Sequence, residues 1–418
     1  MKRPRTSRQA KQTADVQRLI KLSNALSSSS SRLEDDFWDI RLVEEVNQHL
    51  ANSQQNAEAA KIAEDTLMAA LEPLYQETSP AYGALVSTIE TCVEARPAQV
   101  DTVIREGKTA TAITDALMIA IPLLAWSRFP IPSGKIQPAQ LSALRLQLQV
   151  HVLATGTTLS LCDQLWSPDQ LPQTYVETAQ LANQLTRAAL QDKDVQIATT
   201  TINESIQFLS DSRYIVGAIA APQGAALFRW QQTEDALEET PLESATNAWT
   251  SSTSQAIQSI LRTLLPACAV ELQPVRAYHA ALLSTDRASR PWSICATIAY
   301  LQTAFNLLPN HLMAVVARFN GDENDEYRIS LITLTGYRVI HGVVWPLLET
   351  ENDDPALAAE IEGILKTAGI QEITILNQAF SMESCDDCGL PLYPDPEGNI
   401  VHIETPDEQN DKQFKHLH

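Results

Sequence analysis

The strongest constraint on the fold of this chain is a change of pattern after about residue 110, where apolar runs rich in β-branched residues begin to alternate with amphipathic helical segments. Such alternation is typical of the α/β class, in which helices cover the faces of a sheet. The runs that open three successive units are LMIAIPLLAWSRF (117–129), RYIVGAIAAPQGAALFRW (213–230) and HLMAVVARF (311–319). We therefore predict an α/β fold, with α+β as the alternative.

The strands that follow the central helices begin near residues 157, 268 and 370, so the pattern returns every 100–110 residues or so. This spacing raises the hypothesis of an internal triplication. The predicted units are 111–200, 201–308 and 309–403. In the third unit several strands follow one another, and Gly336 lies between two of them, which indicates a hairpin and a mixed sheet.

Before these units, the segment 21–110 is predicted to be an all-helical module with short connections. Further helices are expected at about 56–76, 80–95 and 97–107, with prolines between them. An amphipathic helix over 32–49 would bury an apolar face made of Leu33, Phe37, Ile40, Val43, Val46 and Leu50.

The charge of the chain is unevenly distributed. The formal net charge is −21, yet residues 1–21 hold seven Lys and Arg against one Asp, so the rest of the chain carries −27. A body this acidic repels phosphate, which argues against broad nucleic-acid or membrane binding. Only the basic arm, residues 1–20, could contact a polyanion, and the alternative is that it is a disordered solubilising tail.

The sequence also bears on compartment. No apolar run reaches the roughly 18 residues needed to cross a bilayer, and no apolar region follows the N-terminal charges as in a signal peptide. Four cysteines lie singly in apolar or helical surroundings: Cys92, Cys162, Cys268 and Cys295. Isolated cysteines of this kind are typical of reduced proteins, so we expect a bacterial-type cytoplasm or a similarly reducing compartment.

The stretch CDDCGLPLYPDPEGNIVH (385–402) is the clearest chemical signal. Two cysteines separated by two residues and followed by glycine are typical of a zinc knuckle, and His402 is the expected third ligand. The fourth ligand is open between His416, His418, another cysteine and a partner subunit. Two alternatives remain: an ordinary pair of thiols in a turn, and a redox pair, which the negative charges between the cysteines disfavour.

A second candidate site combines Arg276, His279 and Arg290, in a segment expected to connect a strand to a helix beginning near Pro291. Such loops are where α/β proteins bind ligands, and a helix N-terminus with basic side chains can hold an anion. The alternative is a solvated loop with internal ion pairs. The usual phosphate-binding, nucleophile-elbow and dinucleotide motifs are absent from the sequence.

Short motifs carry a family resemblance: HGVVWPLL (341–348), the 385–402 stretch, WSRFPIPSG (126–134) and SPDQLP (167–172). The chain resembles an uncharacterised betaproteobacterial family of roughly this length, known as a domain of unknown function. The resemblance implies a bacterial cytoplasmic source and gives no activity and no catalytic residues.

The leading hypothesis is a non-enzymatic acidic scaffold or regulatory binding protein, with a structural zinc ion holding its C-terminal part. It implies a protein partner, which includes the case of a homo-oligomer, and no membrane. One alternative is an enzyme with an anion site near Arg276 and His279. The other is a ribosome- or RNA-associated factor using the basic arm. The last residues, 404–418, are expected to form a flexible tail because they offer little to bury.

Overall fold

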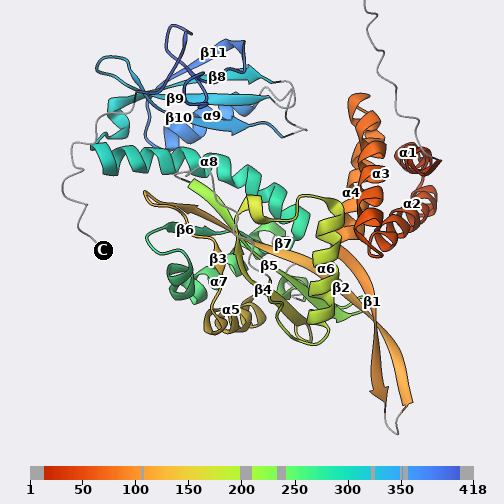
Figure 1. Ribbon diagram of the computed structural model, residues 1–418. Helices are drawn as coiled ribbons and strands as arrows, with labels where there is room; N and C mark the ends of the chain where they lie inside the picture. Colours follow the sequence, from red (N-terminus) through yellow and green to blue (C-terminus); the bar gives the residue numbers. More distant parts are fainter. Residues whose placement is uncertain are drawn as a thin grey trace, which may run out of the picture.

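The computed structural model describes residues 14–104, 108–197, 210–232, 242–321, 325–348, 351 and 356–404. They form a helical module, a first sheet with helices on both faces, and a second, smaller sheet with helices on one face (Figure 1). The fold is α/β with a helical N-terminal region and a mixed second sheet, as the sequence predicts.

Three helices of the helical module begin after a capping residue, namely Ser31, Asn56 and Ser79. Ser31 accepts a hydrogen bond from the backbone of Glu34, and Asn56 accepts one from Ala59, so each satisfies an otherwise unpaired N–H. Inside the module, leucine, isoleucine and valine side chains from all four helices form one core. The helices are α1 (Ala14–Ser27), α2 (Arg32–Asn52), α3 (Ala57–Gln76) and α4 (Pro80–Glu94).

The helix predicted over 97–107 is wrong, because the chain leaves α4 and enters strand β1 (Ala95–Ile104) directly. Pro97 was interpreted as punctuation between helices. In β1 it lies in an edge strand that pairs only with β2 (Lys108–Trp126), where a missing N–H is tolerated.

β2 organises the first sheet. One of its edges pairs with β5 (Ser210–Pro222) over thirteen residues, and its other edge pairs in succession with β1, β7 and β6, all antiparallel. Beyond β5 the order continues to β4 and then β3. The remaining strands are β3 (Gly134–Lys135), β4 (Thr158–Trp166), β6 (Ala269–Leu272) and β7 (Arg276–Ala277).

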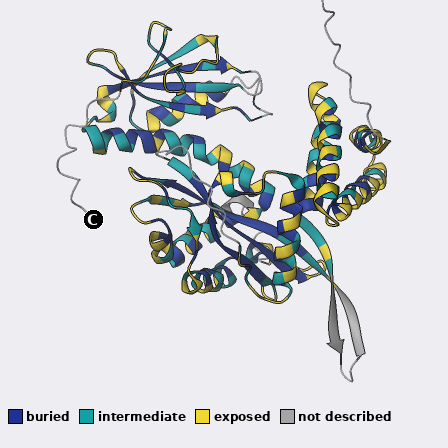
Figure 2. Cartoon of the chain, in the orientation of Figure 1, coloured by how far each residue is buried: buried dark blue, intermediate teal, exposed yellow. Residues whose placement is uncertain are grey.

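Alternating side chains of β2 enter two separate cores. Ile119, Ile121 and Leu123 pack beneath α5 and α7, whereas Met118 and Ala120 pack beneath α6 and the first part of α8. The strands are accordingly buried on both faces, and the helices are exposed on their outer sides (Figure 2). These helices are α5 (Pro138–His151), α6 (Tyr175–Ala189), α7 (Leu242–Leu264) and α8 (Tyr278–Phe305).

This topology corrects the predicted units. β5, from the unit 201–308, lies between β2 and β4, which both come from the unit 111–200, so the two ranges fold around one sheet. The third range has its own sheet of a different strand order. The regular spacing along the chain therefore does not correspond to three equivalent units, because strand order along the sequence differs from strand order in space.

The second sheet has the order β10-β9-β8-β11, in which β11 runs parallel to β8 and the other pairs are antiparallel. α9 makes the crossover to β11. One face packs against α9 and the last part of α8, and the other face lies beneath the C-terminal segment. The elements are β8 (Leu312–Asn320), β9 (Glu326–Thr333), β10 (Val339–Pro346), α9 (Ala356–Thr367) and β11 (Glu372–Ser381).

α8 contributes to both sheets. Tyr278 and Ala281 lie in the core of the first sheet, and Ile294, Ile298 and Leu301 lie in the core of the second. Figure 1 shows this long helix between them. The sequence predicted a helix starting near Pro291, but the proline lies inside α8. Among the helices described, none combines the length and apolar character required to span a bilayer.

Candidate metal centre

The two cysteines lie on a tight turn after β11. Cys385 donates its backbone N–H to Leu390 (2.8 Å), and Gly389 donates its own to the carbonyl of Cys385 (2.8 Å). Gly389 has a φ of 73°, a left-handed conformation that glycine adopts without steric cost. The turn therefore closes because glycine follows Cys388, and it leaves both thiols on the same side of the backbone, close to a common point.

A short hairpin brings His402 back to this turn. β12 (Tyr393–Pro394) pairs with β13 (Ile400–Val401), and His402 follows β13 directly. The turn between the strands is fixed by Asp395, whose carboxylate accepts bonds from the backbone and side chain of Asn399 (2.8 and 2.9 Å). Thirteen intervening residues are thereby folded back, and the histidine reaches the cysteines.

The two thiols and the imidazole have the spacing of metal ligands. One ligand atom each from Cys385, Cys388 and His402 lie within 4.8 Å of one another, and the sulfur of Cys388 is 3.2 Å from Nε2 of His402. Ligands around a tetrahedral zinc ion lie roughly 3.6 Å apart, given Zn–S and Zn–N distances of about 2.3 and 2.1 Å. The three predicted ligands are thus brought together in an arrangement that fits zinc.

The orientation of the histidine ring also suits a metal. Nδ1 lies 2.7 Å from the carbonyl oxygen of Ile403. A carbonyl only accepts hydrogen bonds, so the proton of a neutral ring is held on Nδ1. The lone pair of Nε2 then faces the sulfurs, as in metal-binding histidines whose second nitrogen is fixed by a backbone group.

The segment that carries these ligands is anchored on the second sheet by a buried arginine. Arg328, 1% exposed on β9, donates to the carbonyls of Glu383 and Leu392 (2.6 Å each) and to the carboxylate of Glu326. Ser330 donates to the carbonyl of Pro394. These bonds hold the cysteine turn and the hairpin on the same face of the sheet.

Tyr393 provides the apolar anchor. Its ring is 4% exposed and lies over Gly342 of β10, where an added Cβ would come within 2.2 Å of ring carbons. Burial raises the pKa of Tyr393 to about 12, so the phenol stays neutral. A side chain at position 342 would displace this ring, which explains a glycine in the middle of a strand.

The structure does not place a fourth ligand. His416 and His418, two candidates named from the sequence, lie outside the described residues, as does most of the predicted tail 404–418. Within the part of the chain that is described, the three-residue group above is the only His, Cys, Asp and Glu cluster with this close spacing.

The anion site predicted from Arg276, His279 and Arg290 is not formed. Residues Tyr278–Phe305 form the single helix α8, so the backbones of His279 and Arg290 lie roughly 16 Å apart along its axis. Nδ1 of His279 contacts Glu94 (3.0 Å), Arg290 pairs with Glu351 (2.6 Å), and Arg276 is exposed on β7. Strand, loop and helix were expected here, and the chain instead turns directly from β7 into α8.

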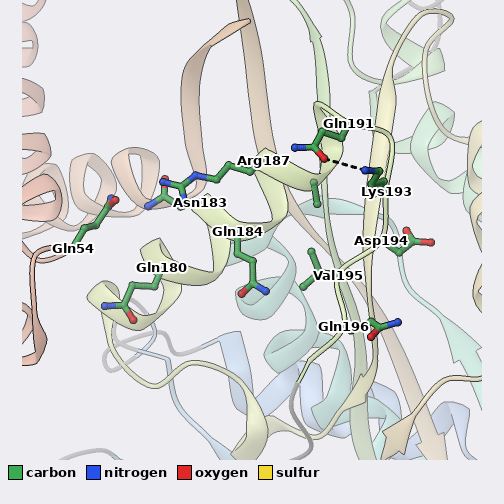
Figure 3. A pocket seen from close by; sticks show the side chains of 11 residues that line it. Gln54, Gln180, Asn183, Gln184, Arg187, Gln191, Lys193, Asp194, Val195 and Gln196 are labelled. Atoms are coloured by element: carbon green, nitrogen blue, oxygen red, sulfur yellow. Dashed lines mark hydrogen bonds between the residues drawn. The ribbon is translucent and has the colours of Figure 1, made fainter.

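Sequence reasoning missed a polar pocket of about 560 Å³ beside α6 (Figure 3). Gln180, Asn183, Gln184 and Arg187 line it from one face of the helix, with Gln54 on one side and the segment 193–196 on the other. The spacing of these four polar residues by three, one and three is visible in the sequence and is the signal that could have indicated the pocket. Its lining residues are largely exposed, and Arg187 and Lys193 are its cations.

No curated protein and no solved structure matches the chain at a significant level. A family model does match, and it covers residues 4–416, almost the whole length. The match spans the helical module, both sheets and the cysteine–histidine segment together. The chain therefore belongs to the family described as "Protein of unknown function (DUF2863)".

Proposed function

We propose that this protein is a non-enzymatic, acidic scaffold or regulatory binding protein, of bacterial cytoplasmic origin, with a structural zinc ion in its C-terminal segment. The observation that carries the binding role is an exposed apolar face on α2. Leu33, Phe37 and Ile40 are 82%, 45% and 55% exposed and follow one another at helical spacing. The sequence predicted a buried face of six residues on this helix, of which Val46 and Leu50 are buried and Val43 is half-buried. Leu42 completes the packed side of α2.

Exposed apolar side chains that gather on one helix face are typical of protein-binding surfaces. Four acidic residues lie along this part of α2 (Glu34, Asp35, Asp36 and Asp39), and the guanidinium of Arg41 lies over the ring of Phe37, 3.4 Å from its centroid. We therefore infer a protein partner that presents apolar side chains flanked by lysine or arginine. Its attraction to α2 would weaken with salt, because exposed charges are screened.

The binding role is tested with Phe37→Asp and with a photo-reactive amino acid at position 33. Leu146→Asp is the matched control, because Leu146 is also an exposed leucine (57%) but lies on α5, which covers the first sheet. We expect one protein to cross-link to position 33 and to bind the purified chain with an affinity that falls as salt rises. This binding should be lost in Phe37→Asp and kept in Leu146→Asp. A self-cross-link with a doubled native mass identifies a second copy as the partner. Equal binding by both variants would contradict the proposal.

The zinc role is supported by the donor set and by its place in the molecule. Cys388 and His402 are exposed, and the pockets of about 370–560 Å³ described in this chain are lined by other residues. Zinc at this position would therefore tie the turn to the hairpin rather than activate a substrate. The free thiol state of all six cysteines fits the reducing compartment that we infer.

Elemental analysis of protein purified without chelator tests this role. We expect about one zinc per chain, a large loss in Cys388→Ser, and no change in Cys295→Ser, which removes an exposed thiol on α8. Chelation should speed hydrogen exchange over residues 380–403 and leave the helical module unchanged. A zinc content well under one per chain would contradict the zinc role, and an ordinary pair of thiols in a turn would then be the better interpretation.

The enzyme and RNA-binding hypotheses are less well supported than the scaffold hypothesis. The enzyme hypothesis rested on the anion site, whose residues lie apart. For the RNA hypothesis, residues 1–13 of the basic arm lie outside the described residues, and Arg18 pairs with Glu45 of α2 (2.8 Å), which commits one cation of the first 21 residues to the helical module.

A further inference from the structure

A pocket of about 530 Å³ lies between the helical module and the first sheet. α3 and α4 form one side, and the first turns of α6 and α8 form the other. Its volume lies in the range of small-molecule sites, and it lies where two parts of the fold meet, a frequent place for ligands. Neither the cysteine–histidine cluster nor the apolar face of α2 takes part in it.

Tyrosines from four helices line this pocket. Tyr75 of α3 and Tyr82 of α4 have ring centroids 5.4 Å apart with an interplanar angle of 53°, and Tyr175 opens α6 on the opposite side. Tyr75 is 45% exposed at the mouth. Tyr278, 1% exposed, is the most deeply buried of these tyrosines, and its hydroxyl has no hydrogen-bond partner among the described residues. The faces of aromatic rings present negative charge density to a ligand, whereas their edges are positive.

The charged residues of the pocket are acidic. Glu64, Glu72 and Glu90 belong to the lining, and the described lining residues include neither lysine nor arginine. Glu64 accepts backbone N–H bonds from Val176 (3.0 Å) and Tyr175 (3.4 Å), and burial raises its pKa. His279 is the one basic ring, and it is already held by Glu94. The pocket is thus set up to attract positive charge.

The placement of the carboxylates indicates the shape of the ligand. Glu64 and Glu72 lie eight residues apart on the same side of α3, so their backbones are separated by roughly 12 Å along the helix. Met68 and Leu71 lie between them on α3, Tyr75 follows three residues after Glu72, and Tyr82 and Tyr175 come from other helices. A ligand that satisfies this arrangement has positive charge at two ends and an apolar chain between.

We propose that this pocket binds a linear organic diamine or polyamine. One ammonium group would pair with Glu64 near the start of α6, the second would pair with Glu72 at the mouth, and the methylene chain would lie against Tyr75 and Tyr82. The net charge of −21 would favour the encounter, since the field of an acidic protein concentrates cations. The site is independent of the proposed protein partner and of zinc.

Isothermal titration of the full chain with 1,5-diaminopentane and spermidine tests the proposal. 1-Aminopentane has one charge and 1,5-pentanediol has none, so they are the matched probes. We expect the diamines to bind, the monoamine to bind about tenfold more weakly, and the diol not to bind, with affinity falling as salt rises. Equal binding of diamine and diol, or no diamine binding at millimolar concentration, would overturn it.

Variants locate the site. Glu72→Gln, at an exposed position, should weaken diamine binding about tenfold, and Tyr75→Ala should weaken it about threefold. Glu58→Gln on the same helix and Tyr337→Ala, both exposed and outside the pocket, are the controls and should bind normally. A lysine-rich peptide is the second probe, because lysine side chains also carry ammonium groups. Binding of the peptide without binding of free diamines would overturn the small-molecule proposal.

Discussion

The first sheet is covered by helices on both faces, whereas the second has helices on one face and an irregular segment on the other. The first sheet is held by apolar side chains from β2 and β5 that interdigitate with four helices. The face of the second sheet that the C-terminal segment covers has only a small apolar cluster around Met313, Val315 and Tyr393. A segment with so little to bury needs polar anchors, and Arg328, Ser330 and the cysteine–histidine cluster are those anchors. Loss of a single polar group should therefore destabilise the second sheet more than the first.

The largest expected effect is at Arg328, because its loss leaves Glu326 and two carbonyls without their buried partner. Arg328→Met should lower the free energy of unfolding of the second sheet by about 3 kcal/mol or more. Hydrogen exchange of β8 and β9 measures it. Arg338→Met is the control, since Arg338 is 62% exposed and 3.9 Å from Glu404. If β8 and β9 keep their protection in the Arg328 variant, the segment is not held by this side chain.

Gly342→Ala tests the apolar anchor. The new methyl group would clash with the ring of Tyr393, so we expect a loss of about 1–3 kcal/mol and loosening of residues 383–402. Gly363→Ala on α9 is the matched control, because nothing lies within 4 Å of the position of its Cβ. The control should be neutral or slightly stabilising. Equal stabilities of the two variants would show that Tyr393 can move at no cost.

The second sheet should also lose stability in mild acid. Burial lowers the pKa of His341 on β10 below the ordinary 6.5, so the unfolded chain binds a proton more readily than the folded one. Stability is therefore lost as pH falls below 6.5, by at most about 1.4 kcal/mol per pH unit for this group. His341→Gln should show a shallower decline between pH 7 and pH 5. Identical slopes for both proteins would exclude His341 as the cause.

The smallest effect is expected far from both sheets, at the start of α2. Ser31 accepts a hydrogen bond from the backbone of Glu34, and Ser31→Ala should cost about 1 kcal/mol or less of helical-module stability. Ser28→Ala, at an exposed position before the cap, is the comparison and should cost less. Urea unfolding followed by circular dichroism measures both. A larger loss at position 28 would mean that α2 begins differently.

Local signals in the sequence predicted local structure well. The helix expected at about 80–95 is α4, which begins at Pro80, and the cysteine spacing with the following Gly389 predicted the turn that brings two thiols together. Prolines misled where tertiary context decides: Pro97 lies in an edge strand, and Pro291 lies inside α8. The insertion of β5 between β2 and β4 could not be read from spacing, because pairing over long sequence distances leaves no periodic trace.

Candidate sites divide in the same way. Cys385, Cys388 and His402 are close in sequence, and a single turn and hairpin suffice to join them. The tyrosine-lined pocket draws on residues from Glu64 to Leu282, so only the packing of α3 and α4 against α6 and α8 creates it. The false anion site failed for a related reason: a loop was inferred where continuous helix fixes Arg290 and His279 on separate turns.

The passage of α8 through both cores has a consequence for how this protein can vary in evolution. A recombination event at the apparent seam near residue 308 would deliver the second sheet without Ile294, Ile298 and Leu301, and only α9 would remain to cover that face. The same cut would leave those side chains projecting from the first sheet. The smallest segment that can be inherited with an intact second sheet therefore includes the latter half of α8. A recombination boundary between the two sheets is expected within this helix rather than after it.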